Sequence, residues 1–206
     1  MTLAEQYVLY ALDPMRGRPA AGVSGAALRL GTAAAILAEL VLHHRLRGDC
    51  SGGVVVDALP DYNPLLVEAS ALLHKAGGPV PVADAVHRVA RGIPGLERRV
   101  IDSLVARDLL HHYRQAFVLH RYPLRSRQAL DEVVAKLDEV IDGGPAGLHE
   151  LAFASLVDGT PVASVRLNAE QRQRLRARLD ADEGGDRVDR ESFRLIRAIA
   201  RTAGAG

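Results

Sequence analysis

Hydrophobic and polar residues follow a helical period over most of this chain. The strongest case is the segment 26–46, which is apolar almost all round through its middle. A helix of that kind buries every face, so we expect it at the centre of a helical assembly rather than on the surface. The other helical segments are amphipathic, and we expect them to pack around it.

Local signals mark where several helices begin. Thr2 and Glu5 have capping-box spacing, Asn63 precedes Pro64, and Ser126 precedes an amphipathic run. Glycines close several of the runs. The pattern predicts eight or nine helices, at about residues 3–12, 26–46, 64–75, 81–91, 94–106, 126–141, 145–157, 168–181 and 189–202.

The period changes after residue 106. Leu110, His112, Phe117 and Leu119 can share one face of two short strands that turn at residues 114–115. We therefore predict a β-hairpin at about 110–120, directly after a helix. The three valines at 54–56 indicate a strand too brief to found a sheet.

The predicted fold class is mainly α, with a single helical domain around a central buried helix (about 26–46) and one protruding β-hairpin (about 110–120). No internal repeat or long linker divides the sequence, so residues 1–206 are expected to form one domain. Apolar residues make up 48% of the chain and aromatic residues only 4%. The core must therefore consist of Leu, Val, Ile and Ala, which favours packed helices.

Charge and cysteine content narrow the environment of the protein. Lys and Arg number 26 against 25 acidic residues, a net charge of +1, so no global charge points to nucleic acid or membrane. The single Cys50 excludes an internal disulfide framework and suits a reducing cytosol. The segment 30–42 contains Glu39 and is shorter than the roughly 20 apolar residues of a membrane span. Without a signal peptide pattern, we expect a cytoplasmic protein that is at most peripheral to a membrane.

Sequence motifs for catalysis and metal binding are missing. There is no GxSxG, no GxxxxGK, and no GxGxxG between a strand and a helix. The histidine pairs at 43–44 and 111–112 are neighbours in sequence, so their side chains point apart and neither pair chelates one ion readily. We therefore expect no enzymatic activity, no cofactor and no metal site.

Arginine is concentrated between residues 88 and 128, where nine arginines stand against three acidic residues. Such a patch suits anionic phosphates, whether of lipid headgroups or of nucleic acid, because the guanidinium group can take phosphate in a bidentate way. The alternative is a solvated face on which Arg98 pairs with Asp102 one helical turn on.

The second half of the predicted hairpin is apolar and consists of Ala116, Phe117, Val118 and Leu119. Exposed apolar groups beside arginines suit insertion at a membrane interface or a contact between subunits. Because only one aromatic side chain is available, we favour self-association over lipid insertion. The alternative is a closed wing, in which Phe117 and Leu119 pack back onto the preceding helix.

Five segments, taken in order, resemble the Golgi phosphoprotein 3 family. They read TLAEQYVLYALD, GTAAAILAELVLHHRL, NPLLVEASALL, SLVARDLL and RYPLRSRQALDEVVAKL. Each alone is weakly specific, but their order and spacing are fairly specific, and the resemblance covers about residues 2–199. That family includes many uncharacterised bacterial, especially actinobacterial, members, and the chain looks like one of these.

The resemblance implies a helical fold around a central buried helix with one protruding hairpin. Eukaryotic members are peripheral membrane proteins that bind phosphatidylinositol 4-phosphate through basic residues and a Trp. Their hairpin serves membrane insertion and oligomer contacts, and they retain glycosyltransferases in the Golgi by binding their cytosolic tails.

Carried over by position, the headgroup pocket of that family is not retained. The Trp position falls near Ser24, and the three arginine positions fall at Ala33 and near Pro94 and Glu97. A displacement of one helical turn would bring in Arg29, Arg98 or Arg99 instead.

Our leading hypothesis is a non-enzymatic protein, peripheral on the inner face of the cell membrane, that binds anionic phospholipid. The expected anion-binding residues are Arg29, Arg91, Arg98 and Arg99. The hairpin is expected to contact membrane or a second subunit in a homo-oligomer. One alternative is a winged-helix nucleic-acid binder, which the acidic residues on the same helix disfavour. The other is a scaffold that binds only protein tails.

Overall fold

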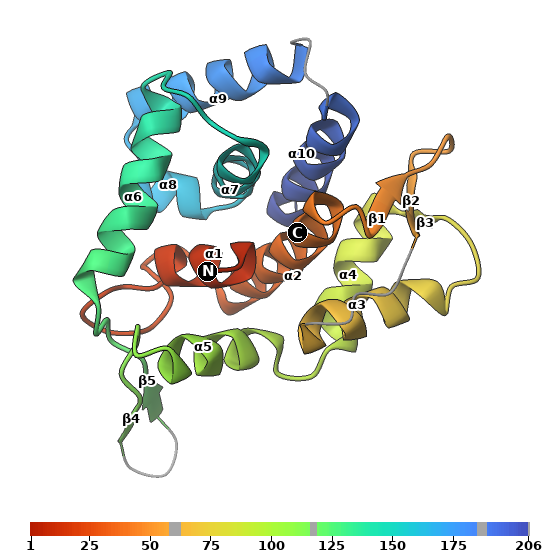
Figure 1. Ribbon diagram of the computed structural model, residues 1–206. Coiled ribbons are helices and arrows are strands. Elements are labelled where there is room, and N and C mark those ends of the chain that lie inside the picture. The colour runs from red at the N-terminus through yellow and green to blue at the C-terminus, as the bar shows by residue number, and fades with distance from the viewer. Residues whose placement is uncertain (58–62, 116–118, 185–188, 206) are drawn as a thin grey trace.

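The computed structural model describes residues 1–57, 63–115, 119–184 and 189–205. Within these ranges the protein has ten helices and two small antiparallel sheets (Figure 1). The mainly α fold class is thereby confirmed. The helices are α1 (Leu3–Ala11), α2 (Gly25–Leu42), α3 (Pro64–His74), α4 (Val82–Gly92), α5 (Leu96–Ala106), α6 (Arg127–Ile141), α7 (Leu148–Asp158), α8 (Val162–Arg166), α9 (Ala169–Gly184) and α10 (Arg190–Gly204). The strands are β1 (Leu46–Gly48), β2 (Gly53–Val56), β3 (Val80–Pro81), β4 (Tyr113–Gln115) and β5 (Leu119–Arg121).

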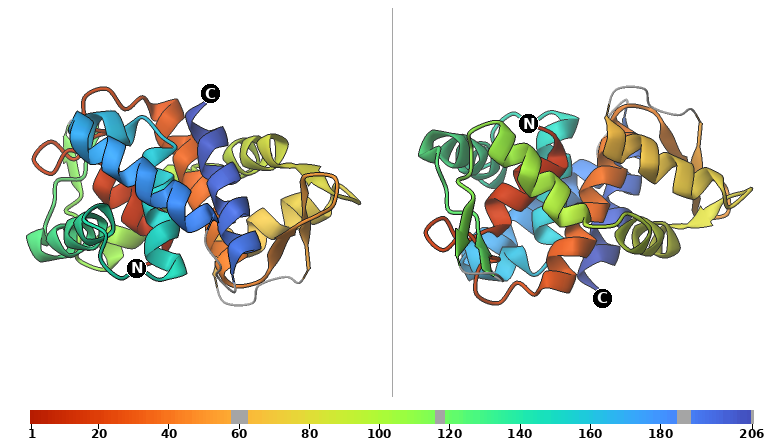
Figure 2. Two further views of the ribbon diagram at one scale, coloured as in Figure 1. Left: turned by 90° about the horizontal axis from the view of Figure 1, so that it is seen from above. Right: turned by 90° about the horizontal axis from the view of Figure 1, so that it is seen from below.

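Helix α2 is the buried centre of the molecule, as its apolar pattern predicts. Every residue from Leu30 to Val41 is buried. Helix α10 crosses above it, and α5 crosses α1 and α2 from below (Figure 2). By length and composition alone α2 is apolar enough to cross a membrane, but 61% of its apolar window is buried inside the molecule. Its residues therefore serve as core.

The predicted end of the central helix at residue 46 is wrong. The helix ends at Leu42, and His44 follows in a left-handed conformation with φ 52°. The chain turns there because Leu46 enters β1 and pairs with Val56. Leu46 continues the apolar helical period in the sequence. In the structure it pairs instead with Val56 of a neighbouring strand, ten residues further on.

The expectation that 54–56 could not found a sheet is also wrong. Strand β2 is the middle of a three-stranded antiparallel sheet, with β1 on one side and β3 on the other. The two partner strands were not predicted from the sequence, because β1 and β3 are only three and two residues long.

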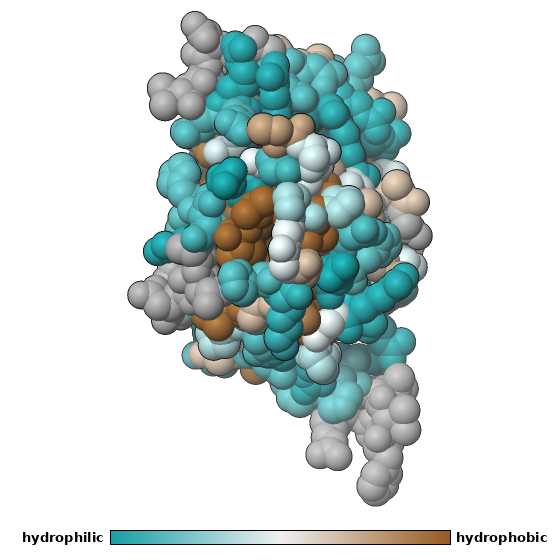
Figure 3. Space-filling model, turned by 90° about the vertical axis from the view of Figure 1, so that its right-hand side faces the viewer, coloured by the Kyte–Doolittle hydropathy of each residue, from teal (hydrophilic) through white to brown (hydrophobic). Residues whose placement is uncertain are grey.

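The face of the molecule that carries this sheet, α3 and α4 shows an apolar patch ringed by hydrophilic residues (Figure 3).

Most predicted helix starts are confirmed by their caps. Thr2 and Glu5 form a reciprocal capping box, Asn63 accepts from the Leu65 amide, and Ser126 accepts from the Ala129 amide. The predicted start of α7 at residue 145 is wrong by three residues, because the Glu150 carboxylate instead accepts the Gly147 amide at 3.1 Å. The short α8 was not predicted.

The hairpin exists, but its register differs from the prediction. Residues 114 and 115 lie in β4, paired with His120 and Leu119, so the predicted turn at 114–115 is wrong. Leu110 lies outside the hairpin and forms an isolated bridge with Leu124. The hairpin protrudes beside the loop between α1 and α2, at the lower left of Figure 1.

Candidate functional site

The base of the hairpin is joined to the loop that connects α1 and α2. The Tyr122 amide donates to the Gly17 carbonyl at 3.0 Å, and the Leu124 amide donates to the Pro14 carbonyl at 2.9 Å. Gly17 has φ +60°, and a Cβ built there would lie 2.1 Å from the Tyr122 carbonyl carbon. Only glycine fits both the left-handed backbone and this close approach, so the sequence at residue 17 fixes where the loop and hairpin meet.

A stack of rings ties the same base to α5. The Arg98 guanidinium lies 5.0 Å from the centre of the Tyr122 ring, and the Tyr122 ring stacks on His112 at 5.1 Å. His112 in turn stacks on His120 in β5, with Nε2 and Nδ1 2.9 Å apart. Burial raises the pKa of the Tyr122 hydroxyl. The ring of Tyr122 is therefore a neutral, buried platform that holds the cation of Arg98 at the hairpin base.

These contacts gather arginines that are far apart in sequence. We call this surface the hairpin base and define it by six arginines and three acidic residues from the loop, α5 and the segment around β5. They are Arg16, Arg18, Arg98, Arg121, Arg125 and Arg127, with Asp13, Asp102 and Asp108. These nine residues carry a net charge of +3, whereas the whole chain carries a net charge of +1.

Four of the six arginines keep their charge available. Arg98 pairs with Asp102 at 2.8 Å, and Arg125 pairs with Asp108. The other four, Arg16, Arg18, Arg121 and Arg127, are exposed and make no ion pair with any carboxylate in the part of the chain that the structure describes. Asp13 has a lowered pKa, chiefly because the Arg16 amide donates to its carboxylate, and to a lesser extent because of the Met15 amide and the nearby charges of Arg16 and Arg166.

Apolar side chains accompany the arginines. Within the described residues, two large hydrophobic side chains are exposed: Met15 at 87% and Tyr113 at 55%. Met15 lies directly before Arg16 in the loop, and Tyr113 lies in β4, paired across the hairpin with Arg121. Exposed apolar groups beside arginines suit a surface that docks on a membrane or on another protein.

The arginines predicted from sequence do not form one pocket. Arg98 and Arg99 point to different neighbours, since Arg98 faces Tyr122 while Arg99 makes a bidentate pair with Glu68 on α3 at 2.7 Å. Arg29 reaches the first turn of α5, where its Nε lies 2.7 Å from Glu97. Arg91 is exposed at the end of α4.

Three of these four predicted residues are already engaged with carboxylates. The Arg99 hydrogen bond holds the pKa of Glu68 below its usual range, and Glu68 raises the pKa of Arg99. The i,i+4 pair between Arg98 and Asp102, which the alternative of a solvated face predicts, is present. Of the four, only Arg98 belongs to the hairpin base.

The predicted hairpin contact residues are only partly visible. Ala116, Phe117 and Val118 lie outside the described residues, and Leu119 is placed by its backbone in β5. Sequence reasoning missed Arg16 and Arg18 altogether. Their only local signal is a glycine between two arginines. They belong to the site because Gly17, which lies between them, accepts a hydrogen bond from the Tyr122 amide, more than a hundred positions away.

Comparison with known proteins places this architecture in a family. The profile of the Golgi phosphoprotein 3 (GPP34) family matches residues 3–199, nearly the whole chain. Among curated proteins, no sequence matches. The central buried helix and the hairpin after α5 are features that the resemblance implied. The chain belongs to the Golgi phosphoprotein 3 family.

Proposed function

We propose that this protein acts by binding rather than by catalysis, as a cytoplasmic peripheral membrane protein that docks on anionic phospholipid through the hairpin base. The observation that carries the proposal is the convergence of six arginines from three separate segments beside exposed Met15 and Tyr113. Membership of a family whose eukaryotic members bind phosphoinositide supports the same chemistry.

The free arginines supply most of the expected binding energy. An arginine near an anionic membrane surface contributes on the order of 1 kcal/mol. Arg16, Arg18, Arg121 and Arg127 together would contribute about 4 kcal/mol, which is roughly a thousandfold in partitioning at 25 °C. Met15 and Tyr113 add apolar contact at the interface, where an aromatic ring with a polar tip is well placed.

The residues predicted from sequence take a lesser part in this proposal. Arg29, Arg98 and Arg99 must leave a carboxylate before they can bind phosphate. Exposed ion pairs of this kind are worth about 0.2–1 kcal/mol, so the exchange is feasible but gains little. Arg91 is exposed and can add to the long-range attraction. We therefore expect general affinity for anionic lipid, with weak preference among headgroups.

Co-sedimentation with vesicles tests the proposal. The full chain is mixed with vesicles of neutral phosphatidylcholine, of phosphatidylcholine with phosphatidylserine, and of phosphatidylcholine with phosphatidylinositol 4-phosphate. We expect binding to both anionic compositions, little binding to the neutral one, and weakening as salt is raised from 0.05 to about 0.5 M because charges are screened. No binding to either anionic composition at physiological salt would overturn the proposal.

A parallel gel shift separates lipid from nucleic acid. Random duplex DNA is titrated with protein up to micromolar concentration under the same salt conditions. The proposal predicts no shift, whereas a steep, salt-dependent shift together with blank vesicles would favour the nucleic-acid reading. Self-association through the hairpin stays a prediction that light scattering can check. Binding of protein tails alone would leave both assays blank.

A further inference from the structure

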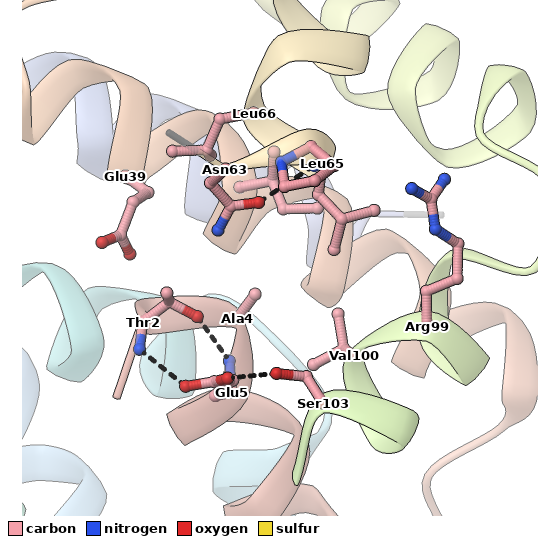
Figure 4. A pocket seen from close by; sticks show the side chains of 12 residues that line it. Thr2, Ala4, Glu5, Glu39, Asn63, Leu65, Leu66, Arg99, Val100 and Ser103 are labelled. Carbon is pink, nitrogen blue, oxygen red and sulfur yellow. Dashed lines mark hydrogen bonds between the residues drawn. The ribbon is translucent and has the colours of Figure 1, made fainter. Parts of the chain in front are cut away.

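A cavity of about 340 Å³ lies between α1, α2, α5 and the first turn of α3 (Figure 4). None of the arginines of the hairpin base lines it. Its volume is at the lower end of the range of about 300–1,000 Å³ that small-molecule sites occupy. The apolar part of the wall consists of Ala4, Ile36, Leu65, Leu66 and Val100, together with the Pro64 ring. Apolar walls with a few convergent polar groups are the usual composition of a binding site for a small organic molecule.

The first acidic group of the cavity, Glu5, has its charge compensated. It is 6% exposed. Its Oε1 accepts the Ser103 hydroxyl at 2.7 Å, and its Oε2 accepts the Thr2 amide at 3.0 Å and the Arg107 guanidinium at 2.6 Å. Glu5 therefore has three donors, one of them a cation, and serves to fix α1 against α5.

The only basic group of the described lining, Arg99, is neutralised in the same way. Both of its terminal nitrogens donate to Glu68 at 2.7 Å, outside the cavity lining. The bidentate pair directs the guanidinium toward α3, away from the carboxylates (Figure 4). An anionic ligand would thus meet two buried carboxylates and an arginine that is already occupied.

Glu39 on α2 is the carboxylate of the cavity that pairs with no arginine or lysine in the described part of the chain. It is 9% exposed, and its Oε2 accepts the Leu3 amide at 2.6 Å. Its Oε1 lies 3.5 Å from Nε2 of His43, a half-exposed imidazole that is charged only when protonated. A buried carboxylate without a firm cationic partner is costly, because it has lost its hydration without a full replacement. A cation that enters the cavity would supply that partner.

From this arrangement we propose that the cavity binds a small primary ammonium compound with a short apolar body. The ammonium group donates to Oε1 of Glu39, and the apolar body lies against Leu65, Leu66 and Val100. Asn63 uses its side-chain oxygen to accept the Leu65 amide at 2.9 Å. Its NH₂ group therefore remains to donate to an acceptor on the ligand. This site is independent of the proposed membrane-docking surface.

A divalent metal fits the same cavity poorly. Calcium takes six to eight oxygen ligands and magnesium six, with few apolar neighbours. The carboxylate oxygens of Glu5 already hold three donors, and the described residues include no group of three or more His, Cys, Asp or Glu side chains placed to hold a metal. The apolar walls favour an organic cation.

Titration of the full chain with n-pentylammonium, followed by amide NMR, tests the proposal. Pentan-1-ol is the neutral probe of the same shape, and pentanoate is the anionic probe. We expect saturable shifts with the ammonium ion at the amides of Leu3 and Leu65, which donate to Glu39 and Asn63. The alcohol and the carboxylate should bind at least about tenfold more weakly, because neither gives a charge-assisted bond to Glu39.

The matched variants are Glu39→Gln and Glu132→Gln. Glutamine keeps the acceptor for the Leu3 amide but removes the charge, so Glu39→Gln should weaken n-pentylammonium binding about tenfold or more. Glu132 is an exposed residue of α6 that receives a hydrogen bond from Gln128, and Glu132→Gln should bind as the wild type does. Wild-type shifts that do not saturate, or that lie away from Leu3 and Leu65, would overturn the proposal even if Glu39→Gln fails to fold. Equal affinity for ammonium and alcohol would also overturn it. This assay contains no vesicles, so the ammonium proposal can fail or succeed independently of the proposed membrane docking.

Discussion

Replacing Gly17 with alanine should separate the loop from the hairpin. An alanine at φ +60° is strained by about 1–2 kcal/mol. Its Cβ would also lie 2.1–2.3 Å from three backbone atoms of Tyr122 and Pro123, which cannot give way as a flexible side chain does. The loop must move by more than 1 Å to reach ordinary contact distances of about 3.5 Å. We expect the two backbone hydrogen bonds at the hairpin base to break, at about 0.5–1.5 kcal/mol each.

The total expected loss in the free energy of unfolding is about 2–5 kcal/mol. Gly77 offers a matched control, because it has φ +73° and nothing within 4 Å of a built Cβ. Gly77→Ala should therefore cost only the backbone strain of about 1–2 kcal/mol. Urea unfolding followed by circular dichroism measures both variants. Equal losses for Gly17→Ala and Gly77→Ala would refute the close approach of loop and hairpin that defines the site.

Three further predictions concern the fold. Leu37 is fully buried in α2, so Leu37→Ala should lower the free energy of unfolding, measured by urea denaturation, by about 2–5 kcal/mol. A loss below about 1 kcal/mol would show that this residue does not lie in a tightly packed core. Thr2→Ala should cost about 0.5–2 kcal/mol by the same assay, since the cap of α1 is lost, and no change would mean that the capping box does not form in solution. Because Arg99 lowers the folded-state pKa of Glu68, the contribution of Glu68 to stability is present above its unfolded pKa of about 4.3 and is lost as pH falls through the lowered folded pKa. Glu68→Gln should thus be less stable than wild type at pH 7 and equal to it near pH 2, and a deficit that persists at low pH would argue against the ion pair.

The sequence predicts the helical elements of this protein well because they depend on local patterns. The all-round apolar run of α2 and the caps at Thr2, Asn63 and Ser126 are decided by residues within one or two turns. The three-stranded sheet escaped prediction because β1 and β3 are two or three residues long and become strands only through pairing with β2. Tertiary pairing overrode the local helical period at Leu46.

The candidate site could be predicted only in part. Sequence reasoning located the basic segment around α5 and the hairpin, and its alternative of a solvated face named the pair of Arg98 and Asp102 that the structure shows. It could not find Arg16 and Arg18, whose place depends on a contact between residues 17 and 122. It also treated Arg29 and Arg99 as free cations, whereas each meets a glutamate from another helix. Ion pairs between distant segments produce no recognisable residue spacing in the sequence.

The most direct test of the docking surface compares two variants with the same change in net charge. In the first, Arg16, Arg18, Arg121 and Arg127 of the hairpin base are replaced with glutamine. In the second, four arginines on α9 and α10 (Figure 1), none of which belongs to the hairpin base, are replaced; they are Arg172, Arg174, Arg176 and Arg194.

The measurement is the partition coefficient of each variant onto phosphatidylserine-containing vesicles at physiological salt, with circular dichroism to confirm folding. At about 1 kcal/mol per arginine, the first variant should bind about a thousandfold more weakly than wild type. The second should change little, since none of its four arginines belongs to the docked surface. Equal loss in both variants, or wild-type binding by the first, would contradict the account.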